Sequence, residues 1–225
     1  MSIARNLFRR TTIATSVAVV AASAVIAPRV GTLHAKPTST STTIEPSNEW
    51  LKGLKGKHRQ FFDAPTANGG VPLVHVMNYY DTYNKAYAVP DRDINGILTF
   101  YGTTTFYGLK DTMWAKYRIG EFLETNDAVT GKPATANPWR TAPVALGLTL
   151  PQASIESMQK RGATFIICNN ALGIFADMLA KARGLPTDSV YTDLKANILP
   201  GVTLVPGMVV AIEKAQGRGI AYHRQ

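Results

Sequence analysis

The sequence contains a single cysteine, Cys168, so the chain cannot form an intramolecular disulfide bond. Exported folds often depend on paired cysteines, and a chain without a pair must take its stability from a packed core. With 225 residues, 45% of them hydrophobic, the chain is long enough for one such domain with appendages. The unpaired thiol is then a small buried hydrophobe, a free reactive group or a partner in an intermolecular bond.

Dense charge of one sign is also missing. The chain has 24 basic and 15 acidic residues, but four of the arginines fall in the first 35 residues, which hold no acid. The remainder therefore carries 20 basic and 15 acidic residues and has no dense basic run. We expect no nucleic-acid partner.

The usual signatures of cofactor and metal enzymes are absent from the sequence. The run Gly102-Thr103-Thr104-Thr105 lacks the lysine of a phosphate loop, and there is no dinucleotide-binding glycine pattern or Gly-x-Ser-x-Gly element. The histidines are too scattered for zinc ligation: His34, His58, His75 and His223. We therefore expect no cofactor and no metal site. Of the histidines, His75 is predicted to be a core residue and His58 part of a solvated basic face.

The first 35 residues are typical of an export signal. A basic start containing Arg9 and Arg10 precedes an uncharged run over 11–27, and the pair resembles a twin-arginine motif. That run is rich in Ala and Thr and weakly hydrophobic for a membrane span, so we expect no stable span after cleavage and a periplasmic or cell-envelope location. Retention of the segment as an anchor is the alternative. Cleavage could follow one of three small residues: Ala24, Ala27 or Ala35.

The rest of the chain divides into three predicted parts. Residues 36–47 are rich in Thr, Ser and Pro and indicate a disordered linker. Residues 48–69 are predicted to be a helical extension on the outside of the core, and 70–225 the main domain. Residues 125–148 are predicted to be an inserted loop, since they show little periodicity.

Apolar runs and helical periodicity alternate along the predicted domain. We expect strands over 71–77, 94–101, 164–167, 202–205 and 220–223. We expect the main helices over 111–123, 149–160, 169–183, 190–197 and 207–216, the second opened by a capping box of Thr149 and Gln152. Alternation of this kind predicts an α/β fold: a single three-layer domain with a parallel sheet of about five strands and helices on both faces.

The clearest local unit surrounds the cysteine. A short apolar strand ends at Cys168, Asn169 and Asn170 can each cap a helix, and the helix is predicted to stop at Gly184. Ligand sites in open α/β sheets gather at the carboxyl ends of strands, and a helix amino end favours a thiolate over a thiol. Cys168 is therefore the candidate catalytic residue, although a buried cysteine at a strand end would look the same.

Polar and aromatic residues follow the first two predicted strands and the cysteine. If the sheet is parallel, they share one edge with Cys168 and could form a small binding pocket. The predicted substrate-binding residues are Asn78, Tyr79, Tyr101, Gly102, Thr103, Asn169 and Asn170. Strand-end turns and a helix cap would account for the same residues without any ligand.

The carboxyl half of the chain resembles the DsrE/DsrF-like family. The resemblance is carried by residues 161–172, which contain the strand and Cys168, and by the pattern of 205–209 and 216–222. It implies a compact α/β fold assembled as trimers or hexamers. It also implies sulfur relay as a persulfide, as in TusD-type members, on the cysteine at the position of Cys168.

Two hypotheses follow. In the first, the chain is an exported DsrE-like sulfur carrier or sulfurtransferase that uses a Cys168 persulfide. With no second cysteine, it would need a sulfur donor or acceptor, either a protein or a small sulfur compound. In the second, the same fold is a non-catalytic module for a small ligand or for assembly, with an inert Cys168. Trp50, Phe61 and Phe62 would form an exposed apolar patch unless covered, which favours a homo-oligomer.

Overall fold

A computed structural model of the protein describes residues 48–225. The predicted export signal and linker, residues 1–47, lie outside the described residues. Residues 48–225 fall within one compact unit and form a single domain. Apart from its turns, this domain alternates strands and helices along most of its length.

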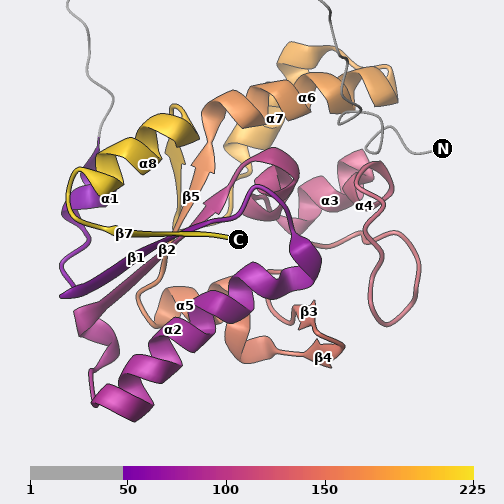
Figure 1. Ribbon diagram of the computed structural model, residues 1–225. Coiled ribbons are helices and arrows are strands. Elements are labelled where there is room, and N and C mark those ends of the chain that lie inside the picture. Colours follow the sequence, from indigo (N-terminus) through magenta and orange to yellow (C-terminus); the bar gives the residue numbers. More distant parts are fainter. Residues whose placement is uncertain (1–47) are drawn as a thin grey trace, which may run out of the picture. The chain divides into compact units, whose positions relative to one another are not determined.

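Five strands form one parallel sheet, which confirms the predicted fold class (Figure 1). The spatial order is β6-β5-β2-β1-β7, with every pairing parallel. The strands are β1 (His58–Asp63), β2 (Ile94–Phe100), β5 (Thr164–Cys168), β6 (Val202–Val205) and β7 (Ala221–Arg224). Parallel strands place all their carboxyl ends at one edge, and this edge carries the end of β5 with the cysteine.

Helices cover both faces of the sheet. One face packs against α1 (Glu49–Lys52) and α8 (Met208–Gln216), and the other against α2 (Val71–Tyr87) and α5 (Ile155–Lys160) (Figure 1). The remaining helices are α3 (Asp111–Tyr117), α4 (Ile119–Phe122), α6 (Asn169–Arg183) and α7 (Thr187–Ala196). Four short 3-10 helices each lie between a strand and an α-helix: η2 (Asn68–Gly70), η3 (Asp91–Asp93), η4 (Gly102–Gly108) and η5 (Pro151–Ala153).

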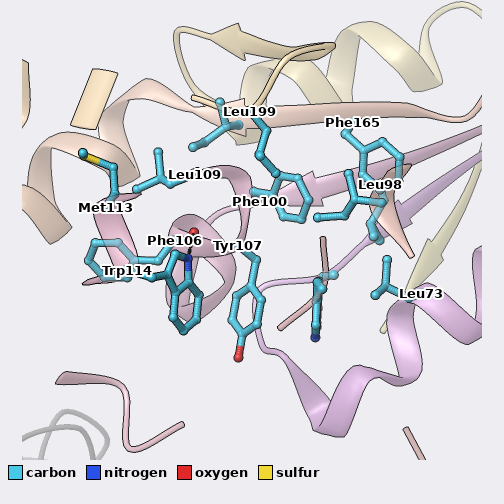
Figure 2. Close-up of a cluster of buried hydrophobic side chains, with 14 of the residues drawn as sticks. Leu73, Leu98, Phe100, Phe106, Tyr107, Leu109, Met113, Trp114, Phe165 and Leu199 are labelled. Atoms are coloured by element: carbon cyan, nitrogen blue, oxygen red, sulfur yellow. Dashed lines mark hydrogen bonds between the residues drawn. The ribbon is translucent and has the colours of Figure 1, made fainter. Parts of the chain in front are cut away.

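The two faces have cores of different chemistry. The larger core lies on the α2 side and is rich in aromatic rings (Figure 2). There the rings of Phe100 and Phe165 stack with centroids 5.7 Å apart, and Trp114 Nε1 donates to the carbonyl of Phe106 at 3.0 Å. The smaller core, on the side of α1 and α8, is mainly aliphatic and contains Cys168.

The predicted inserted loop over 125–148 is mostly irregular but is held to the domain. The Trp139 ring lies 4.3 Å from that of Tyr107, and Asn137 Nδ2 donates to the carbonyls of Tyr107 and Leu109 at 2.7 and 2.9 Å. The loop ends in a small hairpin of β3 (Val144–Ala145) and β4 (Leu148–Thr149). Buried side chains thus fix its position, which its weak periodicity did not indicate.

The prediction of a helical extension over 48–69 is wrong. Only α1 is helical there, and β1 is an interior strand between β2 and β7. Phe61 and Phe62 are both buried because they face opposite sides of the sheet, and the spacing of apolar residues imitated a helix. The domain therefore begins before residue 70, and Trp50, Phe61 and Phe62 are covered by the chain itself, which removes their argument for an oligomer.

The predicted strand over 71–77 is also wrong, because these residues are the first two turns of α2. Pro72 stands in the first turn, where its missing N–H costs nothing. Leu73, Val76 and Tyr80 are fully buried and recur at helical spacing on one face. A short apolar stretch rich in valine cannot by itself distinguish a buried strand from a helix start.

Several helix boundaries also differ from prediction. Ser154, not Thr149, caps α5: its Oγ accepts from the Ser157 N–H at 3.2 Å. The expected helix over 111–123 breaks at Arg118, which adopts a left-handed φ of 52°. The predicted end of the helix after Cys168 is confirmed: α6 stops at Gly184, which has a φ of 64°.

Candidate functional site

Cys168 lies where β5 passes into α6, as predicted. Its Sγ accepts hydrogen bonds from the backbone N–H of Ala171 at 3.4 Å and of Met208 at 3.3 Å. Cys168 is itself the N-cap of α6, so the prediction that Asn169 or Asn170 caps this helix is wrong. The sulfur thus takes the acceptor role that a serine or aspartate oxygen usually fills at a helix start.

The second donor comes from a different helix. The turn after β6, Pro206-Gly207, brings the start of α8 against the start of α6, and the Asn170 N–H donates to the Pro206 carbonyl at 3.3 Å. A Cβ on Gly207 would lie 3.3 Å from Asn170 Nδ2, which shows how close the two segments are. Two helix amino ends, each with a partial positive charge, therefore converge on one sulfur.

Most of the thiol is covered. Cys168 is 5% exposed and belongs to the aliphatic core formed with α1 and α8. Other members of this core include Leu51, Ile166, Val205 and Met208. The sulfur therefore has polar contacts to backbone amides and apolar contacts elsewhere.

A buried carboxylate lies on the same face and at the same edge of the sheet. Asp63, at the end of β1, is 1% exposed, and its Oδ2 accepts from the Tyr222 hydroxyl at 2.6 Å and from Arg224 Nη1 at 3.2 Å. Its Oδ1 has no hydrogen-bond partner among residues 48–225. The sequence pattern predicts a helix over β1, so Asp63 is absent from the predicted site. An acidic residue at the end of a strand is the signal that could have identified it.

Tyr101 connects this carboxylate to the surroundings of the thiol. The pairing of Phe100 with Ile167 places the next residues, Tyr101 and Cys168, on a common face, and Tyr101 packs on the core that holds Cys168. Burial, and then the nearby Asp63 carboxylate, raise the pKa of Tyr101 well above its usual range. Its hydroxyl therefore stays protonated and can donate to an anion.

The other predicted residues of this edge lie in η4, directly after β2, or in the first turn of α6. Gly102 has a φ of 60°, and Thr103 donates from its N–H to the Pro65 carbonyl at 2.9 Å. Asn169 Oδ1 accepts from the Tyr191 hydroxyl at 2.7 Å and so binds α7. Asn170 is exposed at the surface.

Asn78 and Tyr79 do not share the edge with Cys168, which corrects the prediction. Both lie on α2 and line a cavity of about 610 Å³ against β1 and β7. Tyr79 packs on the aromatic core, whereas Cys168 belongs to the aliphatic core across the sheet. The cavity also includes His58 and His75, so neither histidine has its predicted environment.

Within residues 48–225, no cluster of three or more His, Cys, Asp or Glu side chains is arranged to hold a metal ion. In the same range, no helix has both the length and the apolar character needed to cross a membrane.

Comparison with known proteins adds little. No protein-family model matches the sequence, and no curated protein matches it. Among solved structures, a protein of unknown function, MTH1491 from Methanobacterium thermoautotrophicum, is similar with a TM-score of 0.37 and 15% sequence identity. The alignment covers 75% of this chain and 99% of that chain. Such a similarity carries no conclusion on function, which must come from the residues around Cys168.

Proposed function

We propose that the protein is an exported, DsrE-like sulfur carrier or sulfurtransferase in which Cys168 holds the transferred sulfur as a persulfide. One observation supports this more than any other: Cys168 Sγ accepts two backbone hydrogen bonds, from the amino ends of α6 and α8. Amides aimed at a sulfur stabilise negative charge, and the thiolate is the nucleophilic form of cysteine. The resemblance of residues 161–172 to the DsrE/DsrF-like family supports the same role.

The proposed step is a transfer of sulfane sulfur. The Cys168 thiolate attacks the outer sulfur of thiosulfate, a sulfur–sulfur bond forms at Sγ, and the donor's sulfur–sulfur bond breaks to release sulfite. The thiolate and the thiosulfate dianion become a persulfide anion and the sulfite dianion, so charge and atoms balance. An acceptor thiolate then attacks the outer sulfur of the persulfide and regenerates the Cys168 thiolate. The Tyr101 hydroxyl could donate a hydrogen bond to an anion at this edge.

Two further features belong to the proposal. The chain has no second cysteine, so the sulfur must pass to another subunit, a partner protein or a small thiol. The family resemblance leads us to propose a homo-oligomer, a trimer or hexamer. Light scattering that gives the mass of a monomer would remove this part of the proposal.

The test is intact mass spectrometry of the native protein after incubation with thiosulfate or polysulfide. We expect a mass increase of one sulfur atom that a reducing thiol reverses. Cys168→Ser is the matched control, since it replaces the only thiol and keeps an oxygen that can cap α6. An unmodified wild-type protein, or equal modification of Cys168→Ser, would contradict sulfur transfer.

The second candidate, a binding module with an inert Cys168, is favoured by the 5% exposure of the thiol. Alkylation with iodoacetamide distinguishes the two. Carriage of sulfur requires labelling of the native protein at a rate that rises with pH, as thiolate forms. Labelling only after denaturation would favour the inert cysteine.

A further inference from the structure

The cavity against α2, called the α2 cavity below, lies outside the cysteine site. It is bounded by α2, β1 and β7, with a volume of about 610 Å³. Small-molecule sites commonly have volumes of roughly 300–1,000 Å³ and combine apolar walls with a few polar groups. This space is on the face of the sheet opposite Cys168, so sulfur chemistry does not explain it.

One wall of the cavity is a stripe of tyrosines. Tyr79, Tyr83 and Tyr87 recur every four residues on α2 and therefore share one side of the helix. The Tyr79 and Tyr83 rings meet edge to face with centroids 5.1 Å apart, and the Tyr83 and Tyr87 centroids are 5.5 Å apart. Tyr87 remains 68% exposed, so the stripe continues from the core into solvent, where core packing gives no reason for a third ring.

The opposite wall comes from the sheet. Phe62 of β1 meets Tyr79 edge to face at 5.6 Å, and His58 lies 4.2 Å from Tyr83 between ring centroids. His223 of β7 stacks on Phe62 at 5.8 Å. Ring faces and ring edges from three elements thus surround one space, and aromatic rings prefer to receive another ring stacked or edge-on.

The polar groups in the lining are imidazoles, side-chain amides and hydroxyls. His75, Asn78, Gln60 and Thr82 add hydrogen-bonding atoms, and the cavity lining has no Asp, Glu, Lys or Arg. Imidazole and amide groups can donate to acceptor atoms. A cationic ligand would find aromatic faces but no carboxylate to balance its charge.

We propose that the α2 cavity binds a planar aromatic compound that carries an uncharged or anionic polar substituent. The ring system enters between the tyrosine stripe and Phe62. The polar substituent accepts hydrogen bonds from the imidazole and amide groups of the lining. Tyr83 is the central contact, because it touches both its helix neighbours and His58.

The test is a titration of the full chain with 2-naphthoate, followed by calorimetry and by NMR. Two analogues serve as controls: the saturated decalin-2-carboxylate, which keeps the charge but not the flat ring, and a naphthylmethyl-trimethylammonium ion, which reverses the charge. We expect 2-naphthoate to bind about tenfold more tightly than either, the scale of one good aromatic contact. Equal or tighter binding of the saturated acid or of the cation would overturn the proposal.

Two variants locate the binding. Tyr83→Leu removes the central ring and should weaken 2-naphthoate binding by about tenfold, while Tyr83→Phe retains it. Thr82→Trp changes an exposed position on α2 and should fill the cavity and abolish binding. If both Tyr83→Leu and Thr82→Trp bind like wild type, the ligand lies elsewhere and the proposal fails. It fails too if 2-naphthoate does not bind and Thr82→Trp instead abolishes a concentration-dependent dimer, since a second copy then fills the cavity.

Discussion

The Cys168 edge and the α2 cavity occupy opposite faces of the same sheet and are built from different materials. At Cys168 the polar partners are backbone N–H groups, and the side chains around them are mainly aliphatic and buried. In the cavity the polar partners are side chains, and the surroundings are aromatic rings that extend into solvent. A site made from helix ends depends on the exact path of the chain, whereas a site made from side chains can be altered without disturbing the fold.

The largest difference between the regions should therefore appear when the backbone is forced to move. Gly102, at the end of β2, has φ 60°, and a Cβ there would lie 2.5 Å from the Pro65 carbonyl oxygen. Gly69, before α2, has φ 59°, with nothing within 4 Å of a Cβ. We expect Gly102→Ala to lower the free energy of unfolding by about 3 kcal/mol, from left-handed strain plus the clash. Gly69→Ala, with strain alone, should cost about 1 kcal/mol. Urea denaturation measures both, and equal losses would contradict the assigned clash.

A smaller difference in stability between the two regions is expected when a carboxylate side chain is replaced by an amide, or the reverse. Asp63 is buried and accepts from Tyr222 and Arg224, so Asp63→Asn should cost about 2 kcal/mol through weaker charge-assisted hydrogen bonds. Asn78→Asp is the same exchange in reverse at an exposed cavity position, and should change stability by about 0.5 kcal/mol or less. If Asp63→Asn is as mild as Asn78→Asp, the carboxylate is not held as described.

Low pH should weaken the contacts that Arg161 makes with α2. Arg161 donates to Asp81 at 2.7 Å and to Asn84 at 2.7 Å, both on α2, and to Asp91. Burial alone would raise the pKa of Asp81, but hydrogen bonds from Lys85 and Arg161 outweigh it and lower the pKa below its usual value. A lowered carboxyl pKa contributes stability that is present above the unfolded-state value, near 3.9, and is lost as pH falls through the folded-state value.

Arg161→Gln should therefore destabilise the protein at pH 7 by about 1 kcal/mol. Below about pH 4 the wild type should lose part of this advantage, so that the two proteins become more alike. The measurement is urea denaturation across a pH series, with amide exchange on α2 as the local readout. A difference between them that is the same at pH 7 and pH 3 would show that Asp81 does not depend on Arg161.

The two regions also differ in how far the sequence could predict them. The strand, cysteine and helix around Cys168 are consecutive in the chain, so local patterns located them, and only the cap was misassigned. The donor from Met208 was not foreseen, because it depends on how the loop after β6 folds back onto α6. Asp63 was missed for a related reason, since its strand is recognisable only from its pairing with β2 and β7.

The cavity could not be predicted from the sequence, because it forms only if residues 71–87 are a helix. Tyrosines recur at helical spacing over 79–87, but the sequence predicts a strand over 71–77, and that prediction puts Asn78 and Tyr79 at a strand end. His223 and His58 are 165 positions apart in the sequence, and only the parallel pairing of β1 with β7 brings them to one space. Long-range pairing is the information that a local pattern lacks.

The last prediction is that a ligand in the α2 cavity has almost no effect on the reactivity of Cys168. It tests whether the two regions are independent. The sheet lies between them, and no residue lining the cavity belongs to the core around Cys168. Distant sites without shared partners usually act additively, so saturation with 2-naphthoate should change the alkylation rate of Cys168 by less than about twofold. Iodoacetamide labelling followed by intact mass measures this, with Thr82→Trp as the control that cannot take the ligand. A larger change in wild type but not in Thr82→Trp would mean that the sheet transmits a shift from one face to the other, and the cavity would then have to be regarded as part of the cysteine site.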